Sequence, residues 1–401
     1  MDFDDSPSNA AFRARVRAWL EQNAMRHTGH DDRTLRSRDD HELVAMAKAW
    51  QRKKASAGFA GLSLPRDLGG GGLGPIEEVI YRQEESKFRV PFGVYEIGLG
   101  MCVPTLVAIG SEAVRTRHVP PAIRGEEIWC QLFSEPDAGS DLANLRTHAR
   151  ACGDSWVVNG QKVWTTGAQF SDFGLLLART DTQATKHAGL TMFMVDMKAP
   201  GVEVRPIRQM TGETDFNEVF FSDVRIPDSY RLGSPGSGWK SAITTLMFER
   251  LNVGADIGLV DWQAPLEIAR NAGQLSDARV RDNIAAWYLN SRGLTLLTYR
   301  TLTALGQGRM PGPEQSLSKL VAARQAQEIA DLCLDLAAEK GALKSSELGD
   351  TWKGVERAWA WGAAMRIAGG TDEILRNIIA ERVLNLPPEP RDDKGGSPKT
   401  G

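Results

Sequence analysis

Two short segments carry residue types that could hold a flat, polar-edged ligand and a phosphate beside it. Residues 135–141 read EPDAGSD, a turn that brings backbone N–H groups and the Ser140 hydroxyl towards an anionic or carbonyl-rich ligand. Residues 164–167 offer the aromatic face of Trp164 beside two threonine hydroxyls. Together they suit a flavin better than most ligands. Either segment alone is better explained as an acidic turn or as a strand with a core tryptophan.

Composition sets broad limits on the class of protein. The chain has 401 residues, 42% hydrophobic and 25% charged, which is typical of a globular protein with two or three domains. A net charge of −3 with mixed signs indicates no nucleic-acid partner. The acidic start lacks the apolar stretch of a secretory signal, and no run of 18 apolar residues occurs. We therefore expect a cytoplasmic protein without a membrane span.

The cysteines and histidines show no metal-binding pattern. The four cysteines are scattered, which fits a reducing cytosol, and the six histidines form no His-x-x-x-His pair. His27 and His30 stand in a polar segment, where solvated side chains are expected. The sequence predicts no metal site.

Residues 1–128 are predicted to form an all-helical domain. Phe12, Val16, Trp19 and Leu20 recur at the spacing of one helix face, with Ser8 or Asn9 as the expected N-cap. Further helices are expected over 77–87 and 99–109.

The sequence pattern of residues 129–233 predicts β-strands that form a sheet. Asn159-Gly160 lies between apolar β-branched and aromatic residues and predicts a tight hairpin. We expect a compact antiparallel domain resembling a small barrel. Its further strands are expected at 173–178, 190–195, 202–207 and 219–226.

From 234 to 386 helical periodicity returns, and a four-helix bundle is predicted. Ile329, Leu332, Cys333 and Leu336 mark one buried helix face. The expected helices cover 240–270, 277–306, 314–340, 350–366 and 371–384. The tail 387–401 is rich in Pro, Gly and charge, and is predicted to be disordered.

A glycine-rich run at 69–74 matches the spacing of a dinucleotide-binding loop. That motif requires a preceding strand, whereas this run lies among predicted helices. We interpret it as a connection between helices.

Five segments, in order, resemble the acyl-CoA dehydrogenase family, and the resemblance runs from about residue 10 to residue 387. It implies an α+β protein with an N-terminal helical domain, a central β domain and a C-terminal helical bundle. The segments are QLFSEPDAGSD (131–141), NGQKVWTT (159–166), FNEVFFSDVRIP (216–227), FERL (248–251) and GGTDEILRNII (369–379).

The resemblance implies FAD bound in a groove between sheet and helices. Ser134 and Thr166 are expected to hydrogen-bond the edge of the isoalloxazine ring, and Trp164 to pack against it. The residues expected to bind FAD are Gln131, Phe133, Ser134, Gly139, Ser140, Trp164, Thr165, Thr166, Thr371 and Glu373. Those expected near the acyl-CoA substrate are Ser140, Arg250, Gly369 and Gly370.

The implied reaction is α,β-dehydrogenation of an acyl-CoA to the trans-2-enoyl-CoA, with a carboxylate as base and flavin N5 as hydride acceptor. Members of the family carry that Glu either before the C-terminal Gly-Thr or on the helix that begins the last domain. Here the first position is Gly369, so the resemblance assigns the base to Glu249. The alternative is that Glu249 and Arg250 form an exposed helical charge pair.

Two family segments that hold the neighbouring subunit's FAD are altered. The Arg-x-x-Phe-Gly region reads ARNAG at 269–273, and the Gln-x-x-Gly-Gly-x-Gly region reads AEKGA at 338–342. How the adenine end of FAD is held is therefore open. These departures resemble an actinobacterial-type subgroup, some members of which act on sterol side-chain thioesters as paired chains.

The resemblance also implies a role in lipid metabolism, as in fatty acid β-oxidation, with an electron-transferring flavoprotein as acceptor. A homotetramer, a dimer or a heterotetramer with a related chain are all compatible with it. The alternatives are a flavin monooxygenase or oxidase on the same fold, a catalytic chain of a heteromeric sterol-side-chain enzyme, and a non-catalytic partner subunit. The acyl group stays open.

Overall fold

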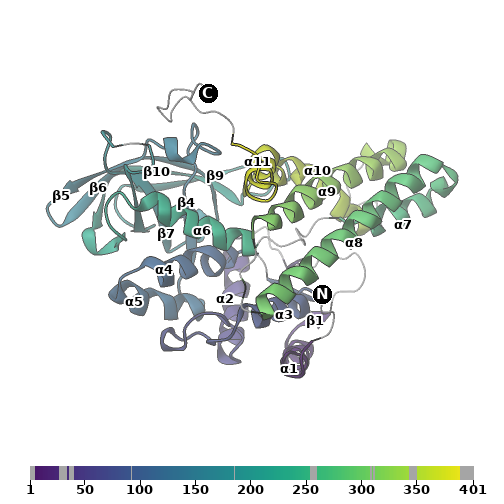
Figure 1. Ribbon diagram of the computed structural model, residues 1–401, viewed down its shortest axis with the longest axis horizontal. Coiled ribbons are helices and arrows are strands. Elements are labelled where there is room, and N and C mark those ends of the chain that lie inside the picture. Colours follow the sequence, from purple (N-terminus) through teal and green to yellow (C-terminus); the bar gives the residue numbers. More distant parts are fainter. Residues whose placement is uncertain are drawn as a thin grey trace.

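The computed structural model describes residues 5–26, 34–35, 40–91, 93–184, 186–252, 260–307, 309, 312–342 and 350–388. The strands of a large sheet come from the middle of the chain, and helices precede and follow them in the sequence (Figure 1). Within these ranges no helix is both long enough and apolar enough to cross a membrane.

The N-terminal part is mainly helical. Its α-helices are α1 (Pro7–Asn23), α2 (Asp40–Ser56), α3 (Pro75–Glu85), α4 (Val103–Ile109) and α5 (Glu112–Ile123), with a π-helix, η2 (Gly98–Cys102), before α4. The predicted face of α1 is confirmed, because Val16 and Leu20 are fully buried and Phe12 and Trp19 pack against the same cluster.

The predicted start of α1 and the all-helical character of this part are wrong in detail. Ser6 is the N-cap, and its hydroxyl accepts a hydrogen bond from the N–H of Asn9 at 3.2 Å. Pro7 follows in the first turn of α1. Backbone N–H groups there have no partner within the helix, so the missing N–H of proline costs no hydrogen bond. Three short strands, β1 (Met25–Arg26), β2 (Thr34–Leu35) and β3 (Phe88–Pro91), also form a small sheet in the order β1-β3-β2.

The glycine-rich run is a connection between helices, as predicted. It joins the short 3-10 helix η1 (Arg66–Leu68) to α3. A Cβ on Gly70 would lie 2.3 Å from the carbonyl oxygen of Leu64, so the chain packs too closely on itself there for any side chain.

The main sheet contains eight strands in the order β11-β8-β7-β5-β6-β10-β9, with β4 paired to β7. Most neighbours are antiparallel, as predicted, but β4 and β5 both pair parallel with β7, so the sheet is mixed. The strands are β4 (Trp129–Leu132), β5 (His148–Cys152), β6 (Ser155–Thr166), β7 (Phe173–Arg179), β8 (Leu190–Asp196), β9 (Val202–Ile207), β10 (Phe216–Pro227) and β11 (Arg231–Leu232).

The predicted hairpin at Asn159-Gly160 is wrong. Strand β6 runs straight through both residues, and the turn lies earlier, between β5 and β6. The Asn159 side chain exchanges two hydrogen bonds with Asp223, where β10 bulges. A Cβ on Gly160 would lie 2.4 Å from Oγ1 of Thr147. This Asn-Gly pair therefore serves close strand packing rather than a turn.

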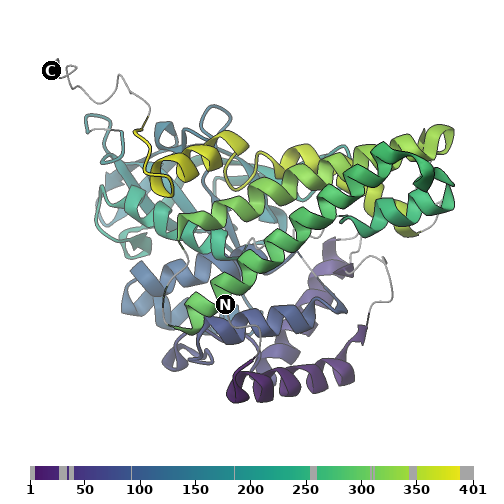
Figure 2. The same cartoon turned by 45° about the vertical axis from the view of Figure 1, so that its right-hand side comes forward.

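The C-terminal helices are α6 (Gly238–Asn252), α7 (Gln263–Asn271), α8 (Ala278–Gly306), α9 (Ser316–Ala337), α10 (Asp350–Met365) and α11 (Asp372–Arg382). A single helix was predicted over 240–270, whereas the described residues of that segment form two, α6 and α7. Helices α8 and α9 lie side by side and project from the body of the molecule (Figures 1 and 2). The predicted face of α9 is confirmed by the complete burial of Ile329 and Cys333. Residues 389–401 and His27 and His30 lie outside the described residues.

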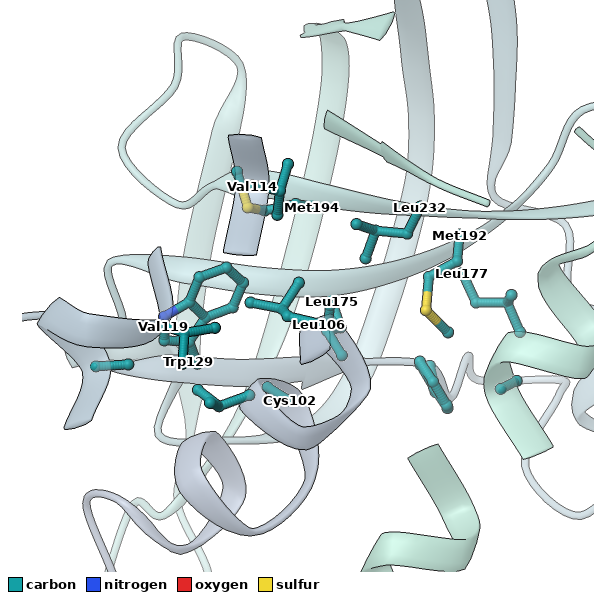
Figure 3. Close-up of a cluster of buried hydrophobic side chains, with 14 of the residues drawn as sticks. Cys102, Leu106, Val114, Val119, Trp129, Leu175, Leu177, Met192, Met194 and Leu232 are labelled. Atoms are coloured by element: carbon teal, nitrogen blue, oxygen red, sulfur yellow. The ribbon is translucent and has the colours of Figure 1, made fainter. Parts of the chain in front are cut away.

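The largest core joins the first and last helical parts to one face of the sheet (Figure 3). Leu106 of α4 and Val119 of α5 pack with Trp129 and Leu175 of the sheet, all at most 1% exposed. Ala242 of α6 belongs to the same core. Helix α6 is thereby held between the sheet and α4.

Candidate functional site

The EPDAGSD turn begins at Glu135, shortly after β4 ends at Leu132. The backbone groups of Glu135 and Ala138 exchange two hydrogen bonds, of 3.0 and 3.1 Å, which close the turn around Pro136 and Asp137. Gly139 and Ser140 follow on the exposed side, and a Cβ on Gly139 would meet nothing within 4 Å. The turn therefore leaves open space at the position where the sequence predicted a ligand contact.

Strand β6 brings the two predicted segments together. The N–H group of Val163 donates to the carbonyl of Ser134 at 2.9 Å. Nζ of Lys162 donates to the carbonyl of Phe133 at 2.9 Å and to Oε1 of Glu135 at 2.8 Å. Gln131 pairs with Leu175 inside the sheet. Ser134 thus lies directly beside the strand that carries Trp164.

Trp164 leaves the regular ladder of the sheet. Lys162 pairs with Val219 and Thr165 with Asn217, so Val163 and Trp164 together oppose the single residue Glu218. This is a β-bulge, and Trp164 has the left-handed φ of +58° that is costly for a bulky residue. Its side chain is 59% exposed. The bulge therefore turns a large aromatic ring out of the sheet.

The two threonines after Trp164 differ in their surroundings. Thr165 is 1% exposed, and its Oγ1 has no hydrogen-bond partner among the described residues. Its carbonyl accepts a hydrogen bond from Asn217 at 3.0 Å. Thr166 is half-buried and pairs with Phe216 at the end of β6. Of the two, Thr166 is the one nearer to solvent.

A pocket of about 230 Å³ lies between this edge of the sheet and α10. Typical ligand pockets measure ~300–1,000 Å³, so it can hold only part of a dinucleotide. The ring of Phe216 packs edge-on against Trp164 at 5.9 Å and tilted against Trp361 at 5.5 Å. The lining residues are Trp164, Ile207, Arg208, Gln209, Met210, Thr211, Phe216, Ala360, Trp361 and Ala364.

The segment 369–373 forms the turn into α11. Gly369 and Gly370 have φ values of +64° and +100°, which favour glycine. Thr371 is the N-cap, and its hydroxyl oxygen accepts from the N–H of Ile374 at 3.2 Å. Glu373 is exposed, and hydrogen bonds from its own backbone N–H and from Thr371 lower the pKa of its carboxyl group. The single proton of the Thr371 hydroxyl is therefore directed at the Glu373 carboxylate.

Two neighbouring side chains hold this turn in place. Lys319 of α9 donates to the carbonyl of Gly370. Arg366 bonds to the buried carboxylate of Asp372. The hydrogen bonds described for this turn tie it to α9, to Arg366 just after α10 and to α11, whereas those of residues 133–138 tie that segment to β6 and to residues 146 and 147. The two predicted parts of the site are thus held by different sets of hydrogen bonds.

Glu249 and Arg250 lie in the last turn of α6. Their side chains are outside the part that the structure describes, so the assigned base remains a prediction. Helix α6 itself is well anchored: the hydroxyl of Thr105 in α4 donates to that of Thr245 at 3.0 Å, and both residues are fully buried. This bond fixes α6 one turn before Glu249.

The sequence interpretation missed several residues that shape this region. Lys162 and Glu135 occur only within longer motifs, and neither Phe216 nor Trp361 stands out from its sequence context. Their contacts join residues far apart in the chain, so no local pattern reveals them. The bulge at Val163-Trp164 likewise depends on the register with β10.

Three models of one family match consecutive parts of the chain. The acyl-CoA dehydrogenase N-terminal domain matches residues 6–126, the middle domain 130–224 and the C-terminal domain 236–384. Acyl-CoA dehydrogenase IpdE1 of Mycobacterium tuberculosis is 36% identical over 387 residues, which cover 94% of this chain and 98% of that protein. The chain belongs to the acyl-CoA dehydrogenase family. It is an oxidoreductase of lipid metabolism, and the family is generally FAD-dependent.

Solved structures show the same fold. The structure titled "Tcur3481-Tcur3483 steroid ACAD" has a TM-score of 0.79 and 24% identity, covering 97% of this chain and 100% of that chain. The ChsE4-ChsE5 complex from Mycobacterium tuberculosis has a TM-score of 0.74 and 25% identity, with the same coverage. The family and fold predicted from the sequence are thus confirmed.

Proposed function

We propose that this acyl-CoA dehydrogenase binds FAD beside Trp164 and uses Glu249 to remove the α-proton of an acyl-CoA. The observation that carries the proposal is the bulge that exposes Trp164 beside the Ser134 segment, where Trp164 lines a mainly apolar pocket. An exposed tryptophan held at an unfavourable φ suits a binding role better than a core role.

The residues present fit a flavin. Trp164 and Phe216 offer apolar ring faces, and Ser134 and Thr166 offer hydroxyls near the same strand edge. The open space at Gly139 allows a bulky group to approach the backbone N–H groups of the turn. Thr371 lies at the start of α11, whose N-terminus is a favourable place for a phosphate. When bound, FAD supplies the acceptor for the two electrons and the hydrogen that leave Cβ.

The chain's own residues supply the proton chemistry and the positioning. The carboxylate of Glu249 would take the proton from Cα, which is weakly acidic until negative charge can spread onto the thioester oxygen. The backbone N–H of Gly369 would donate to that oxygen, a role that needs no side chain. Arg250 would support the base or the CoA arm.

The partners belong to the proposal as well. An electron-transferring flavoprotein is the proposed acceptor of electrons. The ChsE4-ChsE5 structure is a complex of two chains. Because ARNAG and AEKGA replace the usual inter-subunit segments, pairing with a related chain is an alternative to a homotetramer or dimer. Native mass spectrometry of the chain alone and with candidate partners distinguishes these assemblies.

Anaerobic addition of acyl-CoA tests the function. The purified protein should be yellow, with about one FAD for each site, and the flavin should bleach when the substrate is added. Slow reoxidation in air supports a dehydrogenase, whereas rapid reoxidation indicates an oxidase. A colourless protein that takes up no FAD, alone or with candidate partner chains, would contradict the proposal.

A further inference from the structure

Lys162 is a completely buried ammonium group that the proposed chemistry does not use. Its side chain is 0% exposed, and its neighbour Glu135 is 7% exposed. Lysine is almost never fully buried unless it is paired, because removing the charge from water is costly. Nζ lies 2.8 Å from Oε1 of Glu135 and 2.9 Å from the carbonyl oxygen of Phe133.

Glu135 extends this contact to a third segment. Its Oε2 accepts the N–H of Arg146 at 2.6 Å, and its Oε1 accepts the N–H of Thr147 at 2.9 Å. These two residues directly precede β5. The ion pair therefore joins β6, the 133–138 turn and the approach to β5 at one buried point.

Lys162 is the last residue of β6 to pair regularly with β10 before the bulge at Val163 and Trp164. Nζ of Lys162 and the N–H of Val163 bond to two consecutive carbonyls, those of Phe133 and Ser134. The next residue is Trp164, which leaves the ladder. Ser134 and Trp164 are thereby held at a fixed separation by a clamp made of their immediate neighbours.

We propose that Lys162, paired with Glu135, is a positioning residue that sets Ser134 and Trp164 to receive the ring of the cofactor. This inference rests on the proposed function, because only that function places FAD at these two residues. Lys162 acts through its neighbours and touches neither cofactor nor substrate.

The pKa shifts of Lys162 and Glu135 are those of a buried pair in which both groups are charged. Burial lowers the pKa of Lys162 to about 8, and the carboxylate of Glu135 limits the fall. Burial alone would raise the pKa of Glu135, but the Lys162 ammonium group and the hydrogen bonds from residues 146 and 147 outweigh burial and lower the pKa. Both groups are therefore charged at neutral pH.

Three variants separate positioning from simple stability. Lys162→Met leaves a buried carboxylate unpaired, so the melting temperature should fall. The double variant Lys162→Met/Glu135→Gln removes both charges and keeps one of the two acceptor oxygens that bond the N–H groups of residues 146 and 147, so its melting temperature should recover in part. In both variants the dissociation constant of FAD should rise at least ~10-fold, the scale of one charge-assisted hydrogen bond, and the absorption spectrum should move towards that of free flavin. Lys198→Met, which breaks an exposed ion pair with Asp172, is the matched control and should change neither.

The outcomes are distinct. If Lys162→Met binds FAD with the affinity and spectrum of the unaltered protein, or if the double variant recovers both together with its stability, the positioning role is wrong. If Lys162→Met does not fold, FAD binding by the double variant is compared with that of Glu135→Gln, which retains Lys162. Weaker binding by the double variant supports the positioning role, and equal binding contradicts it. Failure of the unaltered protein to bind FAD would instead overturn the proposed function and this inference with it.

Discussion

The ring of Trp361 on α10 lies 5.5 Å from the ring of Phe216 at the start of β10, centroid to centroid. Phe216 in turn packs against Trp164. The indole N–H of Trp361 also donates to the carboxylate of Glu213 at 3.3 Å, in the loop between β9 and β10. These contacts join the C-terminal helices to the sheet at the pocket beside Trp164, so the position of α10 and the shape of the pocket are linked.

Trp361→Ala should both destabilise the protein and weaken cofactor binding. Because Trp361 is only half-buried, the loss should be about 1–3 kcal/mol, below the cost in a full core. Thermal unfolding and FAD titration measure the two effects. Trp359→Ala is the control, since Trp359 lies on the same helix and is 47% exposed. Equal effects of both substitutions would contradict a specific role for the contact between Trp361 and Phe216.

Glu249→Gln should retain the fold and the flavin but reduce turnover by at least ~10²-fold, the scale for loss of a positioned general base. The substitution is nearly isosteric, so a stability effect would not explain the loss. Stopped-flow measurement of flavin bleaching with acyl-CoA is the test. A variant that bleaches at the unaltered rate would show that the base lies elsewhere.

Helices and strands were predictable where apolar residues recur at regular spacing along one face. Val16 with Leu20 and Ile329 with Cys333 recur at helical spacing, so burial of one face follows from the sequence. The hairpin prediction at Asn159-Gly160 failed because the conformation of this pair is set by Thr147, which directly precedes β5, and by Asp223 of β10. Local propensity for a turn yields to such tertiary contacts.

The candidate site was predictable only as far as its motifs extend. The sequence predicts Ser134 and Trp164 as ligand contacts because their segments carry donors and an aromatic face, and the structure places Ser134 beside the strand that carries Trp164. The arrangement around them depends on partners distant in sequence: Lys162 follows Glu135 by 27 residues, and Trp361 follows Glu213 by 148. Such contacts arise from the register of strands and the packing of helices, which single-sequence periodicity does not contain.

Gly160→Ala should destabilise the central sheet by more than about 2 kcal/mol, because the added Cβ would overlap Thr147 in a closely packed strand pair. Its φ of +151° adds strain for any other residue. Gly153→Ala is the control: its φ is +63°, but an added Cβ would meet nothing within 4 Å. That substitution should cost only about 1 kcal/mol. Urea unfolding of both variants checks the difference, and equal costs would mean that Thr147 moves aside.

Bulky or branched acyl groups should be preferred over short straight ones. With Gly369 at the alternative position of the base, the volume that a Glu side chain would fill is left free for an α-substituent or a ring system. A straight chain would under-fill such a pocket and lose roughly 0.8 kcal/mol for each methylene-sized contact not made. Comparison of kcat/KM for octanoyl-, isobutyryl- and sterol-side-chain-CoA is the measurement. An optimum at the unbranched medium chain would show that the glycine does not widen the site.

Glu84 should make the packing of α1 on α3 sensitive to acid. Its side chain is 0% exposed and lies 3.2 Å from Arg13, 3.0 Å from Arg17 and 2.7 Å from Lys87. Burial alone would raise the pKa of Glu84, but the hydrogen bonds from these three cations outweigh burial and lower the pKa to about 2. The folded value lies below the ordinary value of 4.5, so the contribution of Glu84 to stability is complete above pH 4.5 and is lost as the pH falls towards 2.

Glu84→Gln should therefore lower the free energy of unfolding at pH 7 by up to about 3 kcal/mol, at ~1.4 kcal/mol per pKa unit. The difference between variant and unaltered protein should shrink between pH 4.5 and 2, because the carboxyl group of the unaltered protein becomes protonated there. Urea unfolding at pH 7, 5 and 3 measures this trend. Glu203→Gln is the control, since Glu203 forms an exposed pair with Arg205 that contributes little. A difference that stays constant from pH 7 to 3 would mean that the Glu84 charge does not hold α1 against α3.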